Sequence, residues 1–564
     1  MRSLLLALAT ALAVASCTPL AQNTMDRLNA QASKEYLSTI RCSQKNGPFW
    51  NAFADKFIYA PAFDFPEAPG ARSYRYSIRF IDDLYRTPIP SHDYTNGKSP
   101  LPTLDELIVL FKENEGKPEW SFTSDSPKAS LSPVWNDITV GNVVLRVDAL
   151  DDGGNLLKTV GAKAFLRDFP FSGPYYGKAR SYREAAVQAL IYAHSRSFVR
   201  YFLDHDVPDP SYRQSGYVCK TTSAIIKGEV MLSTLVPSLK QECLAIARRA
   251  ADFMISAAQA PGTPLEYFPP TYYKEYNPIS IEYTGLTMGM EAAVAAWAYL
   301  DLFDATNERK YFDQALGIAS TYSRIQGADG SVPIKMNIET AEAVNEIKAT
   351  AYDLMDLYNR LESQYKVDTF HESLVKAEKY LFDHALDSFD LTGQFEDVDV
   401  LGLEPFQNLC NATYGNYARY LYTREGSTEK ERNLAKEMLS LVEDQFVHWD
   451  VLKDASGLKE GTTPCVYEQY RYRTPIDASV ATVGSAFLSE YLATGDELAL
   501  AKVTALSDAL TRAQDPRTGL INTYFRYNPT AGLNDFWINC NLASAKLLLK
   551  MSELDSDSAP LAGM

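Results

Sequence analysis

The chain has 564 residues, of which 46% are hydrophobic and 22% are charged, and its formal net charge is −17. A chain of this length can bury a large hydrophobic core and is several times longer than an average domain. The negative charge argues against nucleic-acid binding, which needs a basic face, although a local group of arginines could still bind an anionic substrate.

The first twenty residues, MRSLLLALATALAVASCTPL, have the features of an export signal. Arg2 precedes an apolar run from Leu4 to Val14, which is too short to span a bilayer. The end of this run is similar to a bacterial lipobox, which predicts that Cys17 becomes the lipidated first residue of the mature protein. Lipid chains there would anchor the protein without a spanning helix. A plain signal peptide that is cut nearby is the alternative.

Thr18 follows this cysteine where an aspartate would retain a lipoprotein in the inner membrane, so we expect an outer-membrane protein facing the periplasm or the cell surface. Residues 1–17 are then the signal peptide and residues 18–40 a linker. Six further cysteines match no zinc pattern, and their fifteen possible pairings leave the disulfides unassigned.

Strand patterns fill the region 41–174, which we predict to be a β-sandwich domain. In the stretch from Asn142 to Asp151, apolar residues alternate so that Val143, Leu145 and Val147 share one face. Turn residues then precede a second strand, as in a hairpin. Residues 73–81 and 120–124 are further strand candidates, and residues 103–112 predict a helix inserted between strands.

After Pro174 the pattern changes to helices, often preceded by capping-box signals such as Ser181–Glu184, Thr428–Glu431 and Thr494–Glu497. Apolar stripes at helical spacing predict twelve helices. Their expected ranges are 183–204, 222–234, 238–259, 284–305, 308–326, 342–362, 369–386, 409–424, 429–446, 478–494, 496–514 and 538–553.

The connections between these helices alternate in length. Tight turns join several pairs, whereas long segments join one pair to the next, and long segments in a compact domain are usually functional. This alternation predicts stacked helical hairpins with the long loops on one rim. The long loops span 260–283, 327–341, 387–408, 447–476 and 515–537.

Two similar motifs, Gln326-Gly-Ala-Asp-Gly330 and Gln514-Asp-Pro-Arg-Thr-Gly519, follow the second helix of a pair. With the six hairpins, they make residues 175–555 resemble the six-hairpin glycosidase superfamily. The resemblance implies a mainly α protein in which an (α/α)6 toroid follows the β-sandwich, with a tail over 556–564. It also implies an enzyme that acts on polysaccharides as a hydrolase, lyase or epimerase.

The long loops are rich in tyrosine, whose flat face and polar tip suit sugar rings. They also carry arginines, which can bind a carboxylate through two hydrogen bonds, so we predict a uronic acid or another acidic sugar as substrate. Plugging of the toroid by the tyrosines and salt bridges by the arginines are the alternatives. The predicted substrate-binding residues are Tyr272, Tyr273, Glu282, Glu339, Tyr467, Tyr470, Arg471, Tyr472, Arg473, Tyr524, Arg526 and Trp537.

Glycoside hydrolysis needs one carboxyl group as acid and one as base or nucleophile, about 6.5–9.5 Å apart in inverting enzymes. Glu396 and Asp397 are neighbours in the chain, so we predict that one of them works with Glu468 across the mouth. Asp477 is a further candidate.

We therefore expect an inverting, glucuronidase-like glycoside hydrolase. A lyase or epimerase with a tyrosine base, and a non-catalytic glycan-binding lipoprotein, are the alternatives. No two histidines lie at metal-ligand spacing on one predicted helix, and no phosphate-binding or dinucleotide-binding motif is found, so we predict no metal and no cofactor. The oligomeric state is left open.

Overall fold

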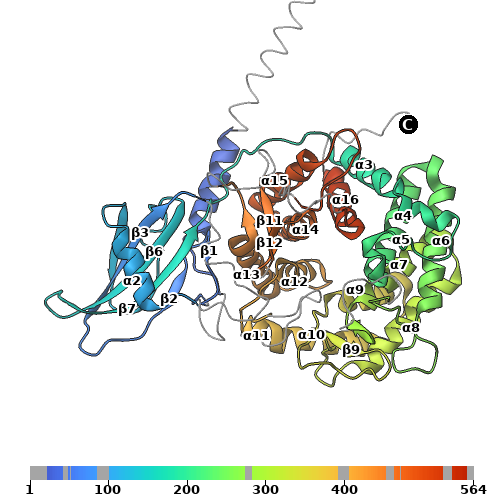
Figure 1. Ribbon diagram of the computed structural model, residues 1–564, viewed down its shortest axis with the longest axis horizontal. Coiled ribbons are helices and arrows are strands. Elements are labelled where there is room, and N and C mark those ends of the chain that lie inside the picture. Colours follow the sequence, from blue (N-terminus) through green and yellow to red (C-terminus); the bar gives the residue numbers. More distant parts are fainter. Residues whose placement is uncertain are drawn as a thin grey trace, which may run out of the picture.

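The computed structural model describes residues 22–41, 49–50, 52–84, 101–273, 283–391, 405–451, 463–470, 472–524 and 536–554. Figure 1 shows a β-rich part on the left and a ring of helices on the right. A helix over residues 22–35 lies between the two parts. None of the helices in these ranges has the length and apolar character that a membrane span requires.

The β-rich part is built on one five-stranded sheet in the order β1-β7-β6-β3-β4. Its strands are β1 (Lys56–Phe57), β3 (Ser73–Asp82), β4 (Glu119–Ser124), β6 (Gly141–Leu150) and β7 (Leu156–Arg167). They pair antiparallel except for β1, which is parallel to β7. The predicted strand over 142–151 and the second strand of its hairpin are therefore confirmed as β6 and β7.

The layers that cover this sheet differ from the predicted sandwich. On one face lies α2 (Leu104–Glu113), whose Phe111 ring packs under Arg79 and Arg146. The other face carries Val143, Leu145 and Val147 as predicted, and it is covered by loops and by the two-stranded sheet of β2 (Ala62–Asp64) and β5 (Lys128–Ser130). Among the described residues, the second layer is thus a short ribbon and not a full second sheet.

The helical part forms a closed double ring (Figure 1). The inner helices each pack against the next, and α16 returns to α5. Each inner helix also packs against the outer helix of its own hairpin. The inner helices are α5 (Val218–Leu235), α7 (Glu291–Thr306), α9 (Tyr352–Tyr365), α12 (Asn411–Thr423), α14 (Asp477–Thr494) and α16 (Ile538–Leu554). The outer helices are α3 (Tyr182–His194), α6 (Lys240–Ala257), α8 (Arg309–Ile325), α10 (His371–Tyr380), α13 (Glu429–Phe446) and α15 (Glu497–Ala513).

The helix pairs are α5–α6, α7–α8, α9–α10, α12–α13, α14–α15 and α16–α3, so the first outer helix completes the last hairpin. Short elements connect them: α4 (Ser197–Arg200), α11 (Leu386–Ser388), β8 (Leu286–Met288), β9 (Lys335–Asn337), β10 (Val447–His448), β11 (Cys465–Gln469) and β12 (Tyr472–Pro475). The predicted (α/α)6 toroid is the observed arrangement of the described helices.

The two glutamine-to-glycine motifs join outer helices. The Gln326 side-chain amide donates to the Gly330 and Ser373 carbonyls, both at 3.0 Å, which ties the end of α8 to α10. Gln514 does the same for α15 and α3, donating to Gly519 and Ala185 at 2.8 Å. Both glycines have positive φ, and each backbone lies against its neighbour too closely for a Cβ atom. The motifs are therefore architectural.

Several predicted helix limits need correction. Helix α9 begins ten residues after the predicted start at residue 342, because β-bridges hold residues 343 and 348 to the 333–336 stretch. Helix α3 ends at His194, and the Thr494–Glu497 signal is not a capping box: Asp496 is the N-cap and accepts from the Leu498 amide. The Thr428–Glu431 capping box is confirmed.

A buried polar network joins the β-rich part to the ring. Glu443 on α13 accepts hydrogen bonds from Tyr36, Tyr59 and Trp449, and its carboxylate lies 2.7 Å from Lys502 Nζ on α15. Burial raises the pKa of Glu443, but the Lys502 ammonium, the Tyr36 hydroxyl and the charge of Lys436 together outweigh burial and lower the pKa below its usual value. The ion pair and its donors therefore fix how the two parts are joined.

Candidate active site

A cavity of about 830 Å³ lies along the centre of the ring. Side chains from all of the inner helices line it, so it is a product of ring closure rather than of any one hairpin. Its volume is in the range of small-molecule sites. We call it the channel.

The channel is locally cationic although the protein is acidic. Its wall contains five basic side chains against three aspartates. The basic ones are Lys220, Lys227, Arg419, Lys546 and Lys550, and the acidic ones are Asp301, Asp353 and Asp356. Because Asp301 is also held by Arg360 at 2.6 Å, part of the negative charge is already neutralised. The channel is thus suited to an anionic ligand.

Asp353 and Asp356 lie on the first two turns of α9. Burial raises the pKa of Asp353 to about 6, with a further contribution from the Asp356 charge, so it exchanges a proton near neutral pH. Burial also raises the pKa of Asp356, and Arg419 at 2.8 Å opposes that rise. Asp353 can therefore take up or release a proton near neutral pH, as a group that catalyses proton transfer must.

Lys546 lies on the opposite wall, on α16. Burial lowers its pKa to about 7, and the charge of Lys227 lowers it further. Burial likewise lowers the pKa of Lys227 and that of Lys550. A bound anion would relieve the repulsion among these ammonium groups.

Aromatic rings also line the channel. Trp297 on α7 lies under the Arg360 guanidinium, 4.6 Å from its carbon, and Tyr352 at the start of α9 lies 5.5 Å from that of Arg419. Such rings can stack on the apolar face of a sugar. The channel therefore combines stacking surfaces with charged groups.

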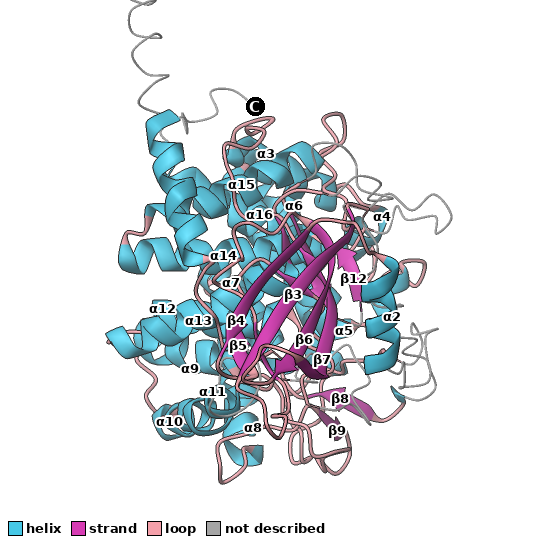
Figure 2. Cartoon of the chain, turned by 90° about the vertical axis from the view of Figure 1, so that its left-hand side faces the viewer, coloured by secondary structure: helices cyan, strands magenta, loops and turns pink. Residues whose placement is uncertain are grey.

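One end of the channel is where the inner helices begin, and the long connections meet there. Strands β8, β9 and β12 come before α7, α9 and α14, and they lie on the same side of the ring in Figure 2. Strand β11 pairs with β12 and is held to α12 by Asn411, whose amide donates to the Tyr467 and Glu468 carbonyls at 2.8 Å. The described parts of the long loops thus share one mouth.

Aromatic side chains gather on one side of this mouth. Tyr272 stacks on Tyr283 with ring centroids 4.8 Å apart and meets Tyr217 edge-on at 5.8 Å. Trp537 lies 6.3 Å from Tyr217, and the Lys335 ammonium is 4.7 Å from the Tyr283 ring. The sequence predicted Tyr272 and Trp537 but missed Tyr217 and Tyr283, the latter although it ends a tyrosine-rich loop.

The remaining predicted residues with described side chains have varied positions. Glu468 is half-buried on β11, and Tyr524 is half-buried at a bridge to Ile476 before α14. Glu339 is exposed in the turn after β9, and Tyr273 packs edge-on against Phe253 of α6. Their roles in substrate binding stay predictions.

Three predicted residues are buried in protein contacts. Asp477, at the start of α14, accepts from the Ala478 amide at 2.8 Å and the Ser544 hydroxyl at 3.1 Å. Burial raises its pKa well above the usual value. Tyr470 donates to Gln445, and the ring of buried Tyr467 lies 4.2 Å from that of His448. Direct contact of these three side chains with substrate is therefore not supported.

Several predictions fall outside the described residues: Cys17, Glu282, Glu396, Asp397, Arg471 and Arg526. For Tyr472 and Arg473 only the backbone, in β12, is described. The channel residues Asp353 and Lys546 were missed because their helices were predicted without orientation. A signal that could have found them is a charged residue on an inner helix, because such a helix packs against neighbours on both sides and has little solvent-exposed surface for a charge.

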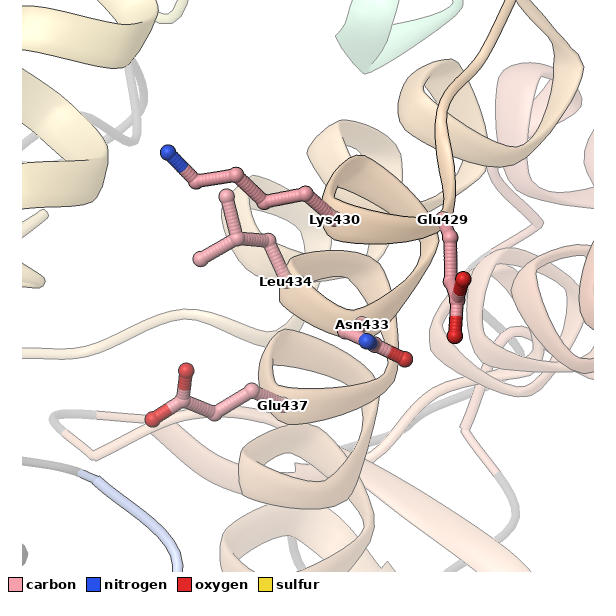
Figure 3. A pocket seen from close by; sticks show the side chains of 5 residues that line it. All are labelled: Glu429, Lys430, Asn433, Leu434 and Glu437. Carbon is pink, nitrogen blue, oxygen red and sulfur yellow. The ribbon is translucent and has the colours of Figure 1, made fainter.

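A second hollow lies on the outside of the ring. Figure 3 shows that its lining residues, Glu429, Lys430, Asn433, Leu434 and Glu437, all belong to α13. Groups from a single helix face do not converge on a bound molecule as those of the channel do. We therefore place the candidate site in the channel and its mouth.

No family model and no curated protein matches the chain. Among solved structures, a family 76 glycoside hydrolase from a bovine Bacteroides thetaiotaomicron strain is 9% identical, with 88% of this chain and 100% of that chain covered and a TM-score of 0.44. Cellobiose 2-epimerase from Spirochaeta thermophila is 13% identical, with 65% and 98% covered and a TM-score of 0.45. Unsaturated glucuronyl hydrolase from Streptococcus agalactiae is 9% identical, with 66% and 90% covered and a TM-score of 0.44.

Proposed function

We propose that the protein is a glycoside hydrolase that acts on an oligosaccharide containing uronic acid, bound from the mouth into the channel. The observation that carries the proposal is a cationic, aromatic-lined channel in a protein whose net charge is −17. A neutral sugar would not need the excess of positive charge. A uronate carboxylate can bind Arg419 and the lysines while its ring stacks on Trp297 or Tyr352.

Asp353 is the proposed general acid. Its pKa of about 6, raised by burial, leaves a small but usable fraction of the carboxyl group protonated at neutral pH, which an unshifted aspartate would not have. In the reaction, Asp353 gives its proton to the glycosidic oxygen, and the bond between this oxygen and the anomeric carbon breaks. A water molecule, deprotonated by a carboxylate, adds to the anomeric carbon from the other face. We propose Glu468 or a carboxylate of the 392–404 segment as that base.

Lys546 supports a second candidate. A neutral amine with a pKa of about 7, lowered by burial, can remove the proton beside a uronate carboxyl group. Proton return on the opposite face gives an epimer, whereas loss of the glycosidic oxygen gives an unsaturated sugar. Tyr352, which is half-buried in the channel wall, suits this role less well, because desolvation raises its pKa well above the usual value.

The test is incubation of the purified protein with uronate-containing oligosaccharides and with neutral oligosaccharides of the same length. New reducing ends with saturated products support hydrolysis, and new ultraviolet absorbance supports elimination. An inverted sugar without chain cleavage supports epimerisation. Binding without any product supports the glycan-binding alternative and rejects the enzyme, and preference for neutral sugars rejects the uronate.

We also propose that the protein is an outer-membrane lipoprotein anchored through Cys17. This residue comes shortly before the helix over 22–35, which is fixed to the ring by the Arg27–Glu497 ion pair and by a bond from Gln31 to Asp496. An anchor so close to a fixed helix would hold the ring near the membrane surface. Replacement of Cys17 by serine should move the protein from the membrane fraction to the soluble fraction, and unchanged fractionation rejects the anchor.

A further inference from the structure

A cluster of potential metal ligands lies away from the channel, where α3, α5 and α6 pack together. It consists of His194 at the end of α3, Glu229 on α5 and Cys243 on α6. All three are buried, and one ligand atom from each lies within 4.8 Å of the other two. The five described cysteines are buried thiols, and Cys243 is the one that shares a cluster with histidine and glutamate.

The distances inside the cluster are close to those of a metal site. His194 Nδ1 lies 2.8 Å from Glu229 Oε2 and 3.8 Å from Cys243 Sγ. Around a tetrahedral zinc ion, with bonds of about 2.0–2.3 Å, neighbouring ligand atoms are roughly 3.3–3.7 Å apart. Small side-chain rotations would bring the three atoms to that spacing.

The second ring nitrogen is held as in metal sites. His194 Nε2 lies 3.1 Å from Glu242 Oε1, and Glu242 is also bonded to Arg200. A metal-bound histidine usually donates its other N–H to a carboxylate, which fixes the ring orientation. Arg200 Nη1 also lies 3.4 Å from His194 Nε2. The charged or titratable groups around the cluster are therefore Glu229, Glu242, His194 itself and Arg200.

The identity of the three donors selects the ion. Imidazole, thiolate and carboxylate together suit Zn²⁺, whereas Mg²⁺ and Ca²⁺ prefer oxygen ligands. An ion pair of His194 with its glutamates alone would need no thiol beside the imidazole. We propose that His194, Glu229 and Cys243 form a zinc site, with a water molecule as the fourth ligand, that ties α3, α5 and α6 together.

Co²⁺, which binds such sites as zinc does and is coloured, is the probe. The full-length protein is stripped with a chelator and titrated with Co²⁺. We expect about one ion per chain and a thiolate-to-cobalt absorption band that Zn²⁺ abolishes. The Cys243→Ser variant should lose the band, whereas Cys410→Ser, which removes another buried thiol, should keep it. The proposal is overturned if the band persists in Cys243→Ser. It is also overturned if the stripped wild-type protein binds no Co²⁺ in the titration.

Glu242→Gln tests the positioning role of the outer carboxylate. It should keep the band and weaken the affinity for Co²⁺ by roughly 10–100-fold. Zn²⁺ should also raise the melting temperature of the stripped wild type. If Cys243→Ser does not fold, this measurement tests the proposal instead. A melting temperature of the stripped wild type that does not change with Zn²⁺ contradicts the proposal.

Discussion

Arg419 on α12 and Asp356 on α9 form an ion pair across the seam between two neighbouring inner helices, with Nη2 and Oδ2 2.8 Å apart. The pair holds one aspartate of α9 close to a fixed cation and leaves Asp353, one turn away, with its pKa raised to about 6 by burial. The two carboxyl groups on α9 thus have different environments. Such a difference separates their pKa values, so that one group can act as an acid while the other stays ionised.

The first prediction concerns this acid. Asp353→Asn cannot give a proton to the glycosidic oxygen, so turnover should fall by about 10²–10⁴-fold while substrate affinity is retained. In the wild type, turnover should decline as the pH rises above about 6, because the acid loses its proton. The measurement is the pH profile of kcat for both proteins. Asp313→Asn, an exposed change on α8, is the control, and full activity in Asp353→Asn removes it from the mechanism.

Glu468→Gln tests the proposed base at the mouth. Since Glu468 is half-buried on a short strand, we expect little change in melting temperature and a large loss of turnover. Activity retained at the wild-type level would assign the base to the 392–404 segment or to another carboxylate.

Lys546→Met tests the anionic ligand. A hydrogen bond to a charged group contributes about 1.5–3 kcal/mol, so uronate oligosaccharides should bind roughly 10–100-fold more weakly and neutral ones almost unchanged. Binding to the wild type should strengthen as the pH falls from about 8 to about 6, because Lys546 gains a proton and Asp353 begins to gain one, and both changes make the channel more positive. Lys430→Met, on the outer face shown in Figure 3, is the control. Equal loss for both sugars would reject the carboxylate contact.

The same variant has a predicted effect on stability. The folded-state pKa of Lys546, lowered by burial to about 7, lies below its ordinary value of 10.5, so the folded protein binds fewer protons between these pH values. Its contribution to stability therefore rises with pH over that window and is lowest below pH 7. Lys546→Met should raise the melting temperature most at the acidic end; a decrease there would contradict the assignment.

Glu443→Gln tests the junction between the β-rich part and the ring. It leaves the Lys502 ammonium buried without its carboxylate, which should cost about 3–5 kcal/mol. Glu437→Gln on the same helix loses only a partly exposed pair with Arg41, 3.2 Å apart, and should cost less than about 1 kcal/mol. Denaturant unfolding of the two variants measures both free energies. Equal losses of stability would show that the Glu443 network does not stabilise the junction.

The turn that ties α15 to α3 provides a backbone test. Gly519 has a φ of +82°, and a Cβ there would lie 2.6 Å from the Gln188 carbonyl oxygen. Gly519→Ala should therefore lower the free energy of unfolding several times more than the backbone strain of a positive φ alone would. Gly262 has a φ of +87° with no heavy atom within 4 Å, so Gly262→Ala should cost only about 1–2 kcal/mol. Similar unfolding free energies for the two variants would show that the close approach does not matter.

The sequence alone determined the parts that depend on local periodicity. The alternation in Val143, Leu145 and Val147 identified the core face of β6, and apolar stripes with alternating connection lengths identified the ring of hairpins. These signals repeat within one element and need no knowledge of its neighbours. The number of layers over the sheet was missed, since covering loops have no such repeat.

Only the tertiary structure indicated where the candidate site lies. Asp353 and Lys546 look like ordinary surface charges on amphipathic helices, and only closure of the ring turns them toward a common channel. Likewise, no spacing on a single helix brings His194 to Cys243, because they come from different helices. The physical reason is that the rotation of each helix about its own axis is fixed by packing against its neighbours, which the linear pattern does not contain.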